Sequence, residues 1–164
     1  MAKTIDTSYT LSDQSLRNAL AEIQGSIVDQ VLNSAGLATG STSKAKVKIA
    51  NTIYALVTGI LVKKTTAEIA IAGTVTNDMF NVYVLSINSD GDVTASMGRE
   101  GATIGEIVFP GTPDDSAVIG FVIVNPTGTG NFVGGTTELD DATVVPNAVY
   151  INTVGTFNPN VLAI

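Results

Sequence analysis

The chain has 164 residues, a formal net charge of −7 and only 14% charged residues, against roughly 25% in an average globular domain. It contains neither cysteine nor histidine, which excludes disulfides, thiolate nucleophiles, cysteine-ligated metals and the Ser-His-Asp and Cys-His catalytic arrangements. The acidic balance argues against nucleic acid as a partner, because neutralising phosphates requires clustered Lys and Arg.

The opening segment, MAKTIDTSYTLSDQ, does not have the pattern of a secretory signal, because it carries one cation and no apolar core. The most apolar stretch of the chain, TIYALVTGILV at 52–62, is too short for a membrane span of about 20 residues. We therefore expect a soluble protein that is synthesised in the cytoplasm and has no membrane partner.

Residues 12–35 are predicted to form an amphipathic helix. Ser12 or Asp13 can cap its N-terminus, and Gly36 offers a left-handed stop. Apolar residues recur at steps of three and four and form one stripe. The stripe consists of Leu16, Leu20, Ile23, Ile27 and Val31. Two partners for it remain open: the sheet of the same chain, or copies of the chain or another protein.

The segment GLATGSTSK at 36–44 is rich in small residues and is predicted to be a linker. Such a linker would let the helix stand away from the rest of the chain, which favours association over packing on the chain's own sheet. We therefore divide the chain into an N-terminal arm at 1–43 and a body at 44–164. The stripe of the predicted helix is the candidate assembly surface.

The body is predicted to be mainly β, as an antiparallel β-sandwich or a jelly-roll-like barrel. Short β-branched runs bounded by Gly, Pro, Asn or Asp follow one another at roughly even spacing. These runs are KVKIANTIYALV, GILVKKT, AEIAIAGTV, FNVYVLSIN, DVTASMG, ATIGEIVFP, SAVIGFVIVNP and TVVPNAVYINTV. The alternating Lys44, Lys46 and Lys48 are interpreted as a solvated sheet edge.

The clearest hairpin is NSDGD at 88–92, in which Asp90 and Gly91 can adopt the positive φ angles of a tight turn. The strand before it, NVYVLSIN at 81–88, is apolar on both faces. A strand with two apolar faces is buried on both sides. We therefore predict that it is a central strand of its sheet.

The same hairpin has the spacing of alternate oxygen ligands in a calcium loop, at Asn88, Asp90 and Asp92. An EF-hand also requires Gly at its sixth position and Glu at its twelfth, where this chain has Val93 and Arg99. The segment is therefore interpreted as a hairpin tip, and a weak cation site at Asp90 and Asp92 remains open.

Two acid pairs, Asp114–Asp115 and Asp140–Asp141, are candidates for general acid-base chemistry or for holding a divalent cation. Both lie in turn-rich segments, PGTPDDS and TTELDDAT, where Asp side chains bond the backbone that follows them. We interpret both pairs as turn formers and assign no catalytic, metal-binding or cofactor-binding residue. A small hydrolase that uses these pairs is the enzymatic alternative.

The segment GTGNFVGGTT at 128–137 has part of the spacing of a phosphate-binding loop. Gly130 and Gly135 match the two glycines of that motif, but its lysine position is Thr136. The sequence that follows is acidic and β-like, whereas a phosphate loop runs into a helix. We predict a structural loop in which the glycines allow left-handed turns and close backbone approach, with Phe132 as its apolar anchor.

The stretch from Ala117 to Pro159, AVIGFVIVNPTGTGNFVGGTTELDDATVVPNAVYINTVGTFNP, resembles a recurrent ending of virion proteins of tailed bacteriophages. The upstream segment FNVYVLSINSDGDVTASMG is similar to these proteins more loosely. The resemblance implies a capsid decoration, cement or head-fibre protein on the capsid surface, with the major capsid protein as partner. Such proteins commonly assemble as trimers, and the resemblance carries no catalytic motif.

Together these observations predict a non-enzymatic virion structural protein that decorates or cements the outside of a phage capsid as a homotrimer. A Thr- and Gly-rich β body with few charged residues suits a protein that presents a surface and does not catalyse a reaction. The alternative is a phage fibre domain or a receptor- or glycan-binding domain, for which exposed aromatic loops are expected.

Overall fold

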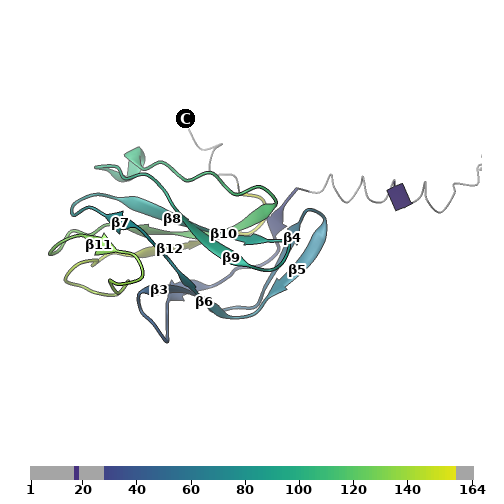
Figure 1. Cartoon of the computed structure of the whole chain (residues 1–164), viewed down its shortest axis with the longest axis horizontal. Coiled ribbons are helices and arrows are strands. Elements are labelled where there is room, and N and C mark those ends of the chain that lie inside the picture. The colour runs from purple at the N-terminus through teal and green to yellow at the C-terminus, as the bar shows by residue number, and fades with distance from the viewer. Residues whose placement is uncertain (1–16, 19–27, 158–164) are drawn as a thin grey trace, which may run out of the picture.

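The computed structural model describes residues 17–18 and 28–157 (Figure 1). The strands in this part of the chain are β1 (Gln30–Val31), β2 (Leu37–Thr39), β3 (Lys46–Ile49), β4 (Ile53–Val57), β5 (Ile60–Lys64), β6 (Ala67–Ala70), β7 (Thr74–Val75), β8 (Asn81–Asn88), β9 (Val93–Met97), β10 (Ser116–Val124), β11 (Phe132–Val133) and β12 (Val149–Asn152). One short 3₁₀ helix, η1 (Ile104–Glu106), lies between β9 and β10. The prediction of a mainly β body is confirmed.

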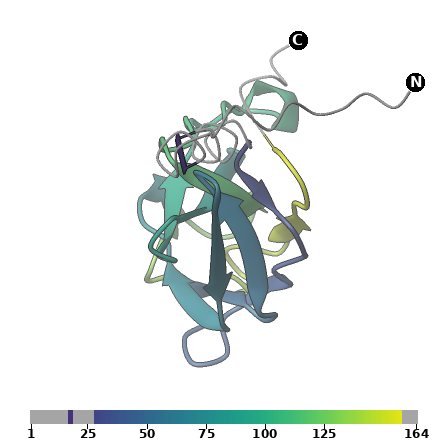
Figure 2. The same cartoon turned by 90° about the vertical axis from the view of Figure 1, so that its right-hand side faces the viewer.

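The strands form antiparallel sheets in two layers. One layer is the four-stranded sheet β12-β10-β8-β9, and the other contains the three-stranded sheets β1-β4-β5 and β2-β3-β6. The main apolar core joins side chains from both layers. Figure 2 shows the ribbons of these sheets from one end of the molecule. The sheets do not close on themselves, so the barrel alternative is wrong.

Strand β8 is central in its sheet, as predicted, between β10 and β9. On one face Tyr83, Leu85 and Ile87 enter the main core, and on the other Val82 and Val84 enter a smaller apolar cluster. The rings of Phe109, Phe121 and Phe157 pack together over that second cluster, with centroids 5.2–6.3 Å apart. Both faces of the strand are therefore covered, which explains its continuous apolar run.

Strand β10 contains a β-bulge between Val118 and Gly120. Ala117 and Ile119 face the main core before the bulge, and Val122 and Val124 face it afterwards. An extra residue in one strand changes which side chains face each side. Because of the bulge, odd-numbered residues in the first part of β10 and even-numbered residues in its second part face the same core.

The hairpin predicted at 88–92 joins β8 to β9. The Asn88 N–H donates to the carbonyl of Asp92 at 3.0 Å, and Gly91 has a φ of 81°. The positive φ predicted for Asp90 is wrong. The strand predicted in ATIGEIVFP is wrong, because its centre is η1. There the Glu106 carboxylate accepts the Thr103 N–H at 3.2 Å, a helix-capping contact that favours a helical turn over an extended strand.

The prediction of a helix is also wrong for its C-terminal part, residues 28–35. Residues 12–16 and 19–27 lie outside the described residues, but residues 28–35 contain no helix and include strand β1. Val31 is fully buried and pairs with Ala55 of β4, while the side chain of Asn33 donates to the Thr52 carbonyl at 2.9 Å. The sheet therefore offers these residues core contacts and hydrogen bonds that outweigh a weak local helical preference.

The segment predicted as a linker is part of the β structure. Strand β2 pairs with β3, and its Leu37 N–H donates to the side-chain oxygen of Asn152 at 2.9 Å. The hydroxyl groups of Thr39 and Tyr150 lie 2.8 Å apart. Strands β1 and β2, which precede residue 43, are thus paired with strands of the predicted body.

The lysines at 44, 46 and 48 do not mark a sheet edge. Strand β3 lies between β2 and β6, so Lys46 and Lys48 sit on a central strand. Their neighbours Val47 and Ile49 are fully buried, and Lys44 instead forms an ion pair with Asp140 at 2.8 Å. The alternation therefore reflects one buried and one solvated face of a strand.

We expect Tyr83→Phe to stabilise the protein by about 1 kcal/mol at neutral pH, because the Tyr83 hydroxyl is buried with no hydrogen-bond partner among the described residues. Burial, and secondarily the charge of Glu100, raises the pKa of this hydroxyl to about 12. Because the folded-state pKa of Tyr83 is raised, its contribution to the free energy of unfolding is fully present below the unfolded-state pKa of about 10. That contribution is lost as pH rises through the folded-state pKa of about 12.

Urea unfolding at pH 7 and at pH 11, followed by circular dichroism, measures both effects of Tyr83→Phe. The variant should be the more stable protein at pH 7, and its advantage should grow at pH 11. A loss of more than about 1 kcal/mol at pH 7 would show that the hydroxyl has a stabilising partner.

Candidate functional site

The hairpin tip at 88–92 uses its polar side chains for the turn. The side-chain oxygen of Asn88 accepts the N–H groups of Asp90 at 3.1 Å and Asp92 at 2.8 Å. Within residues 17–18 and 28–157, no three acidic side chains come together as a group able to hold a metal ion. A weak cation site at Asp90 and Asp92 therefore gains no supporting geometry from this part of the chain.

The carboxylates of the second acid pair have separate partners. Asp140 forms the ion pair with Lys44, whereas Asp141 accepts the N–H of Thr143 at 2.8 Å and also its hydroxyl. The hydrogen bond from the Thr143 hydroxyl is the main cause that lowers the pKa of Asp141. The prediction that Asp141 forms a turn is confirmed.

The first acid pair lies in an exposed turn before β10. Asp114 and Asp115 are both exposed, and Asp115 has a φ of 55°. Aspartate is one of the few residues other than glycine that tolerates this left-handed conformation. The position of the pair is therefore that of a turn, with no other acidic cluster of the described chain gathered around it.

The glycine-rich segment at 128–137 is a structural loop, as predicted. Gly130 and Gly135 have φ angles of 96° and 78°. A side chain at Gly128 would collide with the carbonyl of Thr143, so the two backbones approach each other closely there. Phe132 begins β11, which pairs with β7, and is fully buried.

A carboxylate that the sequence analysis did not single out holds the turn between β2 and β3. Glu68 accepts the N–H groups of Ser41 at 2.6 Å, Thr42 at 2.6 Å and Ser43 at 3.1 Å. The Thr42 N–H is the main cause that lowers the pKa of Glu68. Three successive N–H groups make an anion-binding concavity, and here the chain fills it with its own carboxylate.

A hollow of about 460 Å³ lies beside this carboxylate and is lined in part by Lys48 and Thr66. The ammonium of Lys48 donates to the Ser41 hydroxyl at 2.7 Å. The local sequence signal was the run of Ser and Thr at 41–43, but its acidic partner is about 25 residues away along the chain. Only the pairing of β3 with β6 brings the two together.

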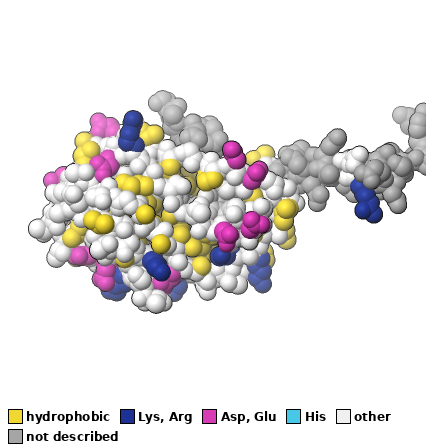
Figure 3. Space-filling model, viewed as in Figure 1, with side chains coloured by type: hydrophobic (Ala, Val, Ile, Leu, Met, Phe, Trp, Pro, Cys, Tyr) yellow, Lys and Arg dark blue, Asp and Glu magenta, His cyan; other side chains and the backbone are white. Residues whose placement is uncertain are grey.

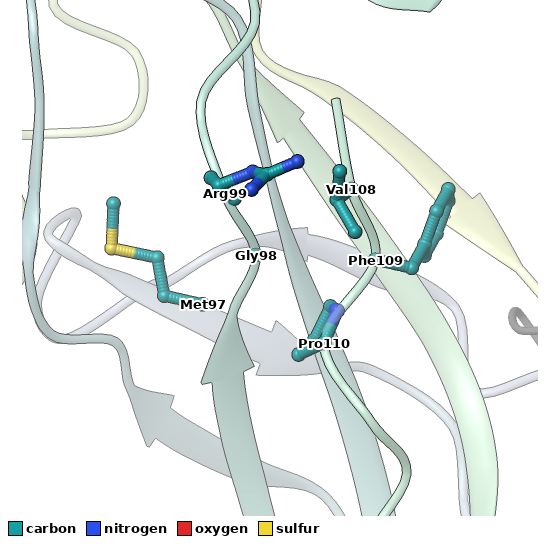
Figure 4. A pocket seen from close by; sticks show the side chains of 6 residues that line it. All are labelled: Met97, Gly98, Arg99, Val108, Phe109 and Pro110. Atoms are coloured by element: carbon teal, nitrogen blue, oxygen red, sulfur yellow. The ribbon is translucent and has the colours of Figure 1, made fainter. Parts of the chain in front are cut away.

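A second hollow, of about 370 Å³, lies at the end of β9 and is lined by Met97, Gly98, Arg99, Val108, Phe109 and Pro110 (Figure 4). Backbone hydrogen bonds of 2.9 and 3.1 Å join Arg99 to Val108. In Figure 4 the Arg99 side chain extends toward Val108. Arg99 is the one charged lining residue, so the hollow has no acid-base pair or nucleophile for catalysis.

The predicted assembly stripe has only one member in the described part of the chain. Leu16, Leu20, Ile23 and Ile27 lie outside the described residues. Val31 is fully buried in β1 and packs in the main core. Val31 is therefore not available to an assembly surface, and the prediction is wrong for this residue.

The outer side of the sheet β1-β4-β5 carries exposed apolar residues that the sequence analysis did not identify. Leu32 lies opposite Tyr54, whose carbonyl accepts the Leu32 N–H at 2.9 Å. On its other side Leu32 lies beside Val154, next to the bridge between Val31 and Gly155. Residues directly opposite each other on paired strands point to the same face.

The same face continues along β4 and β5. Leu56 follows Tyr54 by two residues and is directly paired with Leu61. Figure 2 turns the end of the molecule that holds β4 and β5 toward the viewer. We call this surface the apolar face; it consists of the exposed Leu32, Tyr54, Leu61 and Val154 and the half-buried Leu56.

The remaining surface has few charges. Figure 3 shows one side of the molecule on which uncharged polar atoms predominate, with hydrophobic and charged side chains dispersed among them. This agrees with the low share of charged residues in the sequence. The apolar face differs from such dispersed positions because its members adjoin one another across paired strands.

Comparison with protein-family models, curated proteins and solved structures finds no match to this chain. Residues 17–18 and 28–157 include no helix with the length and hydrophobicity that crossing a membrane requires.

Proposed function

We propose that this protein is a non-enzymatic structural protein of a tailed-phage virion, which decorates or cements the outside of the capsid as a homotrimer. Its partners are copies of itself and the major capsid protein. The net charge of −7 makes nucleic acid an unfavourable partner. On this proposal the protein acts at the capsid surface, after synthesis in the host cytoplasm, without a cofactor.

The observation that carries the assembly role is the apolar face. Contiguous exposed apolar side chains on a soluble protein mark interaction sites. Leu61 and Val154 are 61% and 60% exposed, although they adjoin other apolar members of the face. A body with few charges and one such face is suited to binding other protein surfaces.

The virion part of the proposal rests on the resemblance of residues 117–159 to phage virion proteins. In the structure this stretch supplies β10, β11 and β12, together with the buried Phe132. The resemblance therefore concerns core strands and their connections, which is consistent with a shared structural role. It supplies no active-site residue.

The second acid pair of the hydrolase alternative has structural partners, which favours a structural role for it. Asp140 is paired with Lys44, and Asp141 is bonded to Thr143. The carboxylate of Glu68 is occupied by three backbone N–H groups. General acid-base catalysis needs a group that is free to reach substrate, and these three carboxylates have structural partners.

The test is the solution mass by light scattering, followed by mixing with undecorated capsids of the phage that encodes the chain and sedimentation. We expect a mass of three chains and saturable binding to the capsids. Capsids that already carry their own decoration protein serve as the control, because their sites are occupied.

Co-sedimentation with undecorated capsids alone would support the proposal. A protein that stays in the supernatant with both kinds of capsid would overturn it. In that case a glycan array tests the alternative of a fibre or receptor-binding domain, since specific glycan binding by a protein that ignores capsids belongs to that class.

A further inference from the structure

We propose that the apolar face seats residues 12–27 of a neighbouring copy of this chain, which rests on the homo-oligomer of the proposed function. The evidence has four parts: the exposure of the face, the place where residues 1–27 join the body, the charges near the face and the end of the body at which residue 28 lies.

The apolar face lies on the outer side of the sheet β1-β4-β5, and its exposed members have 40–61% of their residue surface exposed. Its members come from three separate parts of the chain, at 32, 54–61 and 154, and the sheet pairing brings them side by side. The inner side of the same strands is buried, with Val31, Ala55 and Val62 in the core. One side of this sheet is thus covered, and the apolar face on the other side is open.

The described chain begins at this sheet. Val28 lies two residues before β1. Strand β1 pairs with β4 in the sheet whose outer side forms the apolar face. Residues 1–27 are therefore joined to the body at the strand that adjoins Leu32. The segment just before the body contains Leu16, Leu20, Ile23 and Ile27, which is an apolar set suited to an apolar face.

The charges at the rim are complementary to that segment. Lys63 lies on β5 on the same side as Leu61, and its ammonium stands 6.0 Å from the centre of the Tyr54 ring. The segment contains Asp13 before its first apolar position and Glu22 between Leu20 and Ile23, against a single Arg17. Opposite charges at the rim of an interface select the partner and its orientation.

The position of residue 28, together with the homo-oligomer of the proposed function, favours a neighbouring copy. The carboxylate of Asp29 accepts the Thr58 N–H at 2.6 Å. This contact holds the entering chain alongside the turn between β4 and β5. Residue 28 therefore lies at the end of the body that carries this turn (Figure 1), where a neighbouring copy can approach it.

An exchange of this kind between identical chains can close into a ring. Each copy offers one segment and one seat, which makes the contact head-to-tail, and closed head-to-tail contacts give cyclic oligomers. A homotrimer is one such ring. The face of every copy would then be covered without any face meeting another face.

Light scattering on four forms of the chain tests the proposal without capsids. The full chain and Ile104→Lys should have the same oligomeric mass, because Ile104 is 57% exposed but lies on η1, away from the face. Leu61→Lys and a chain that lacks residues 1–27 should both be monomers. Circular dichroism shows whether each variant keeps its β structure, and a variant that loses it is replaced by Val154→Lys.

Two results would overturn the proposal. If Leu61→Lys and Val154→Lys both keep the full oligomeric mass, the face is not an interface. If the chain without residues 1–27 keeps that mass while Leu61→Lys does not, the occupant is the face of another copy and not the segment.

Disulfide trapping separates a neighbouring copy from the same copy. The natural chain has no cysteine, so Glu22→Cys combined with Lys63→Cys introduces two thiols and no others. Under oxidation we expect covalently linked chains, seen as dimers and trimers on a non-reducing gel. A disulfide confined to single chains would place the segment on its own copy and overturn the exchange.

These results are distinguishable from failure of the proposed function. An oligomer that depends on the face and on residues 1–27 but ignores capsids would leave this inference intact and contradict the virion role. A monomer that nevertheless co-sediments with undecorated capsids would do the reverse.

Discussion

Replacing Phe132 with alanine should lower the free energy of unfolding by about 3–5 kcal/mol. The ring is fully buried in the main core and meets the ring of Tyr83 edge-on, with centroids 6.2 Å apart. Its removal leaves a cavity. The glycine-rich loop at 128–137 also loses its fully buried aromatic side chain, which anchors it to the core. Because a domain of this size has a total stability of roughly 5–15 kcal/mol, this is a large fraction.

Urea unfolding followed by circular dichroism measures the loss in Phe132→Ala. The matched control is Val133→Ala, since Val133 is the next residue of β11 but is exposed, and should cost less than about 1 kcal/mol. If Phe132→Ala costs no more than its neighbour, the loop is not anchored by this side chain.

Gly120→Ala should destabilise the protein by about 2–5 kcal/mol. Gly120 follows the bulge in β10 and has a φ of 151°, which residues with a side chain rarely adopt. An added Cβ would also collide with the carbonyl oxygen of Ile151 in β12 and with the side chain of Leu37 in β2. Relieving these contacts requires β12 to move away from its partner strand.

Thermal unfolding by circular dichroism gives the measurement for Gly120→Ala, and Gly105→Ala is the control. Gly105 lies in η1, and an added Cβ there meets nothing within 4 Å among the described residues. We expect the control to melt within a few degrees of the natural protein and Gly120→Ala to melt far below it. Equal melting temperatures would show that β12 adapts without cost.

The elements that the sequence predicted correctly depend on neighbours in the chain. The β8–β9 hairpin follows from Asp90 and Gly91 at its tip and from the apolar run before it. The turn at Asp141 follows from an acceptor only two residues before the Thr143 that donates to it. Likewise, the loop at 128–137 was predicted from its glycines and from Phe132.

The predictions that failed depend on partners far along the chain. The period of the apolar stripe includes Val31, but Val31 is paired with Ala55 and buried in the sheet. The small residues at 36–44 fit a linker, yet Leu37 is held by Asn152, 115 residues away. A helical period over one segment cannot reveal a sheet partner elsewhere in the sequence, which then decides the conformation.

By itself, the sequence determined that the described chain is mainly β and that 81–88 is a central strand. It also determined the turns that form at the hairpin 88–92, in the loop 128–137 and at Asp141. These properties follow from alternation and turn chemistry, which act over a few residues. The tertiary structure alone decided that strands β1 and β2 belong to the sheets and that Leu32, Tyr54 and Leu61 share one open face. Which apolar residues stay exposed depends on how distant strands pair and which of their two faces the core covers.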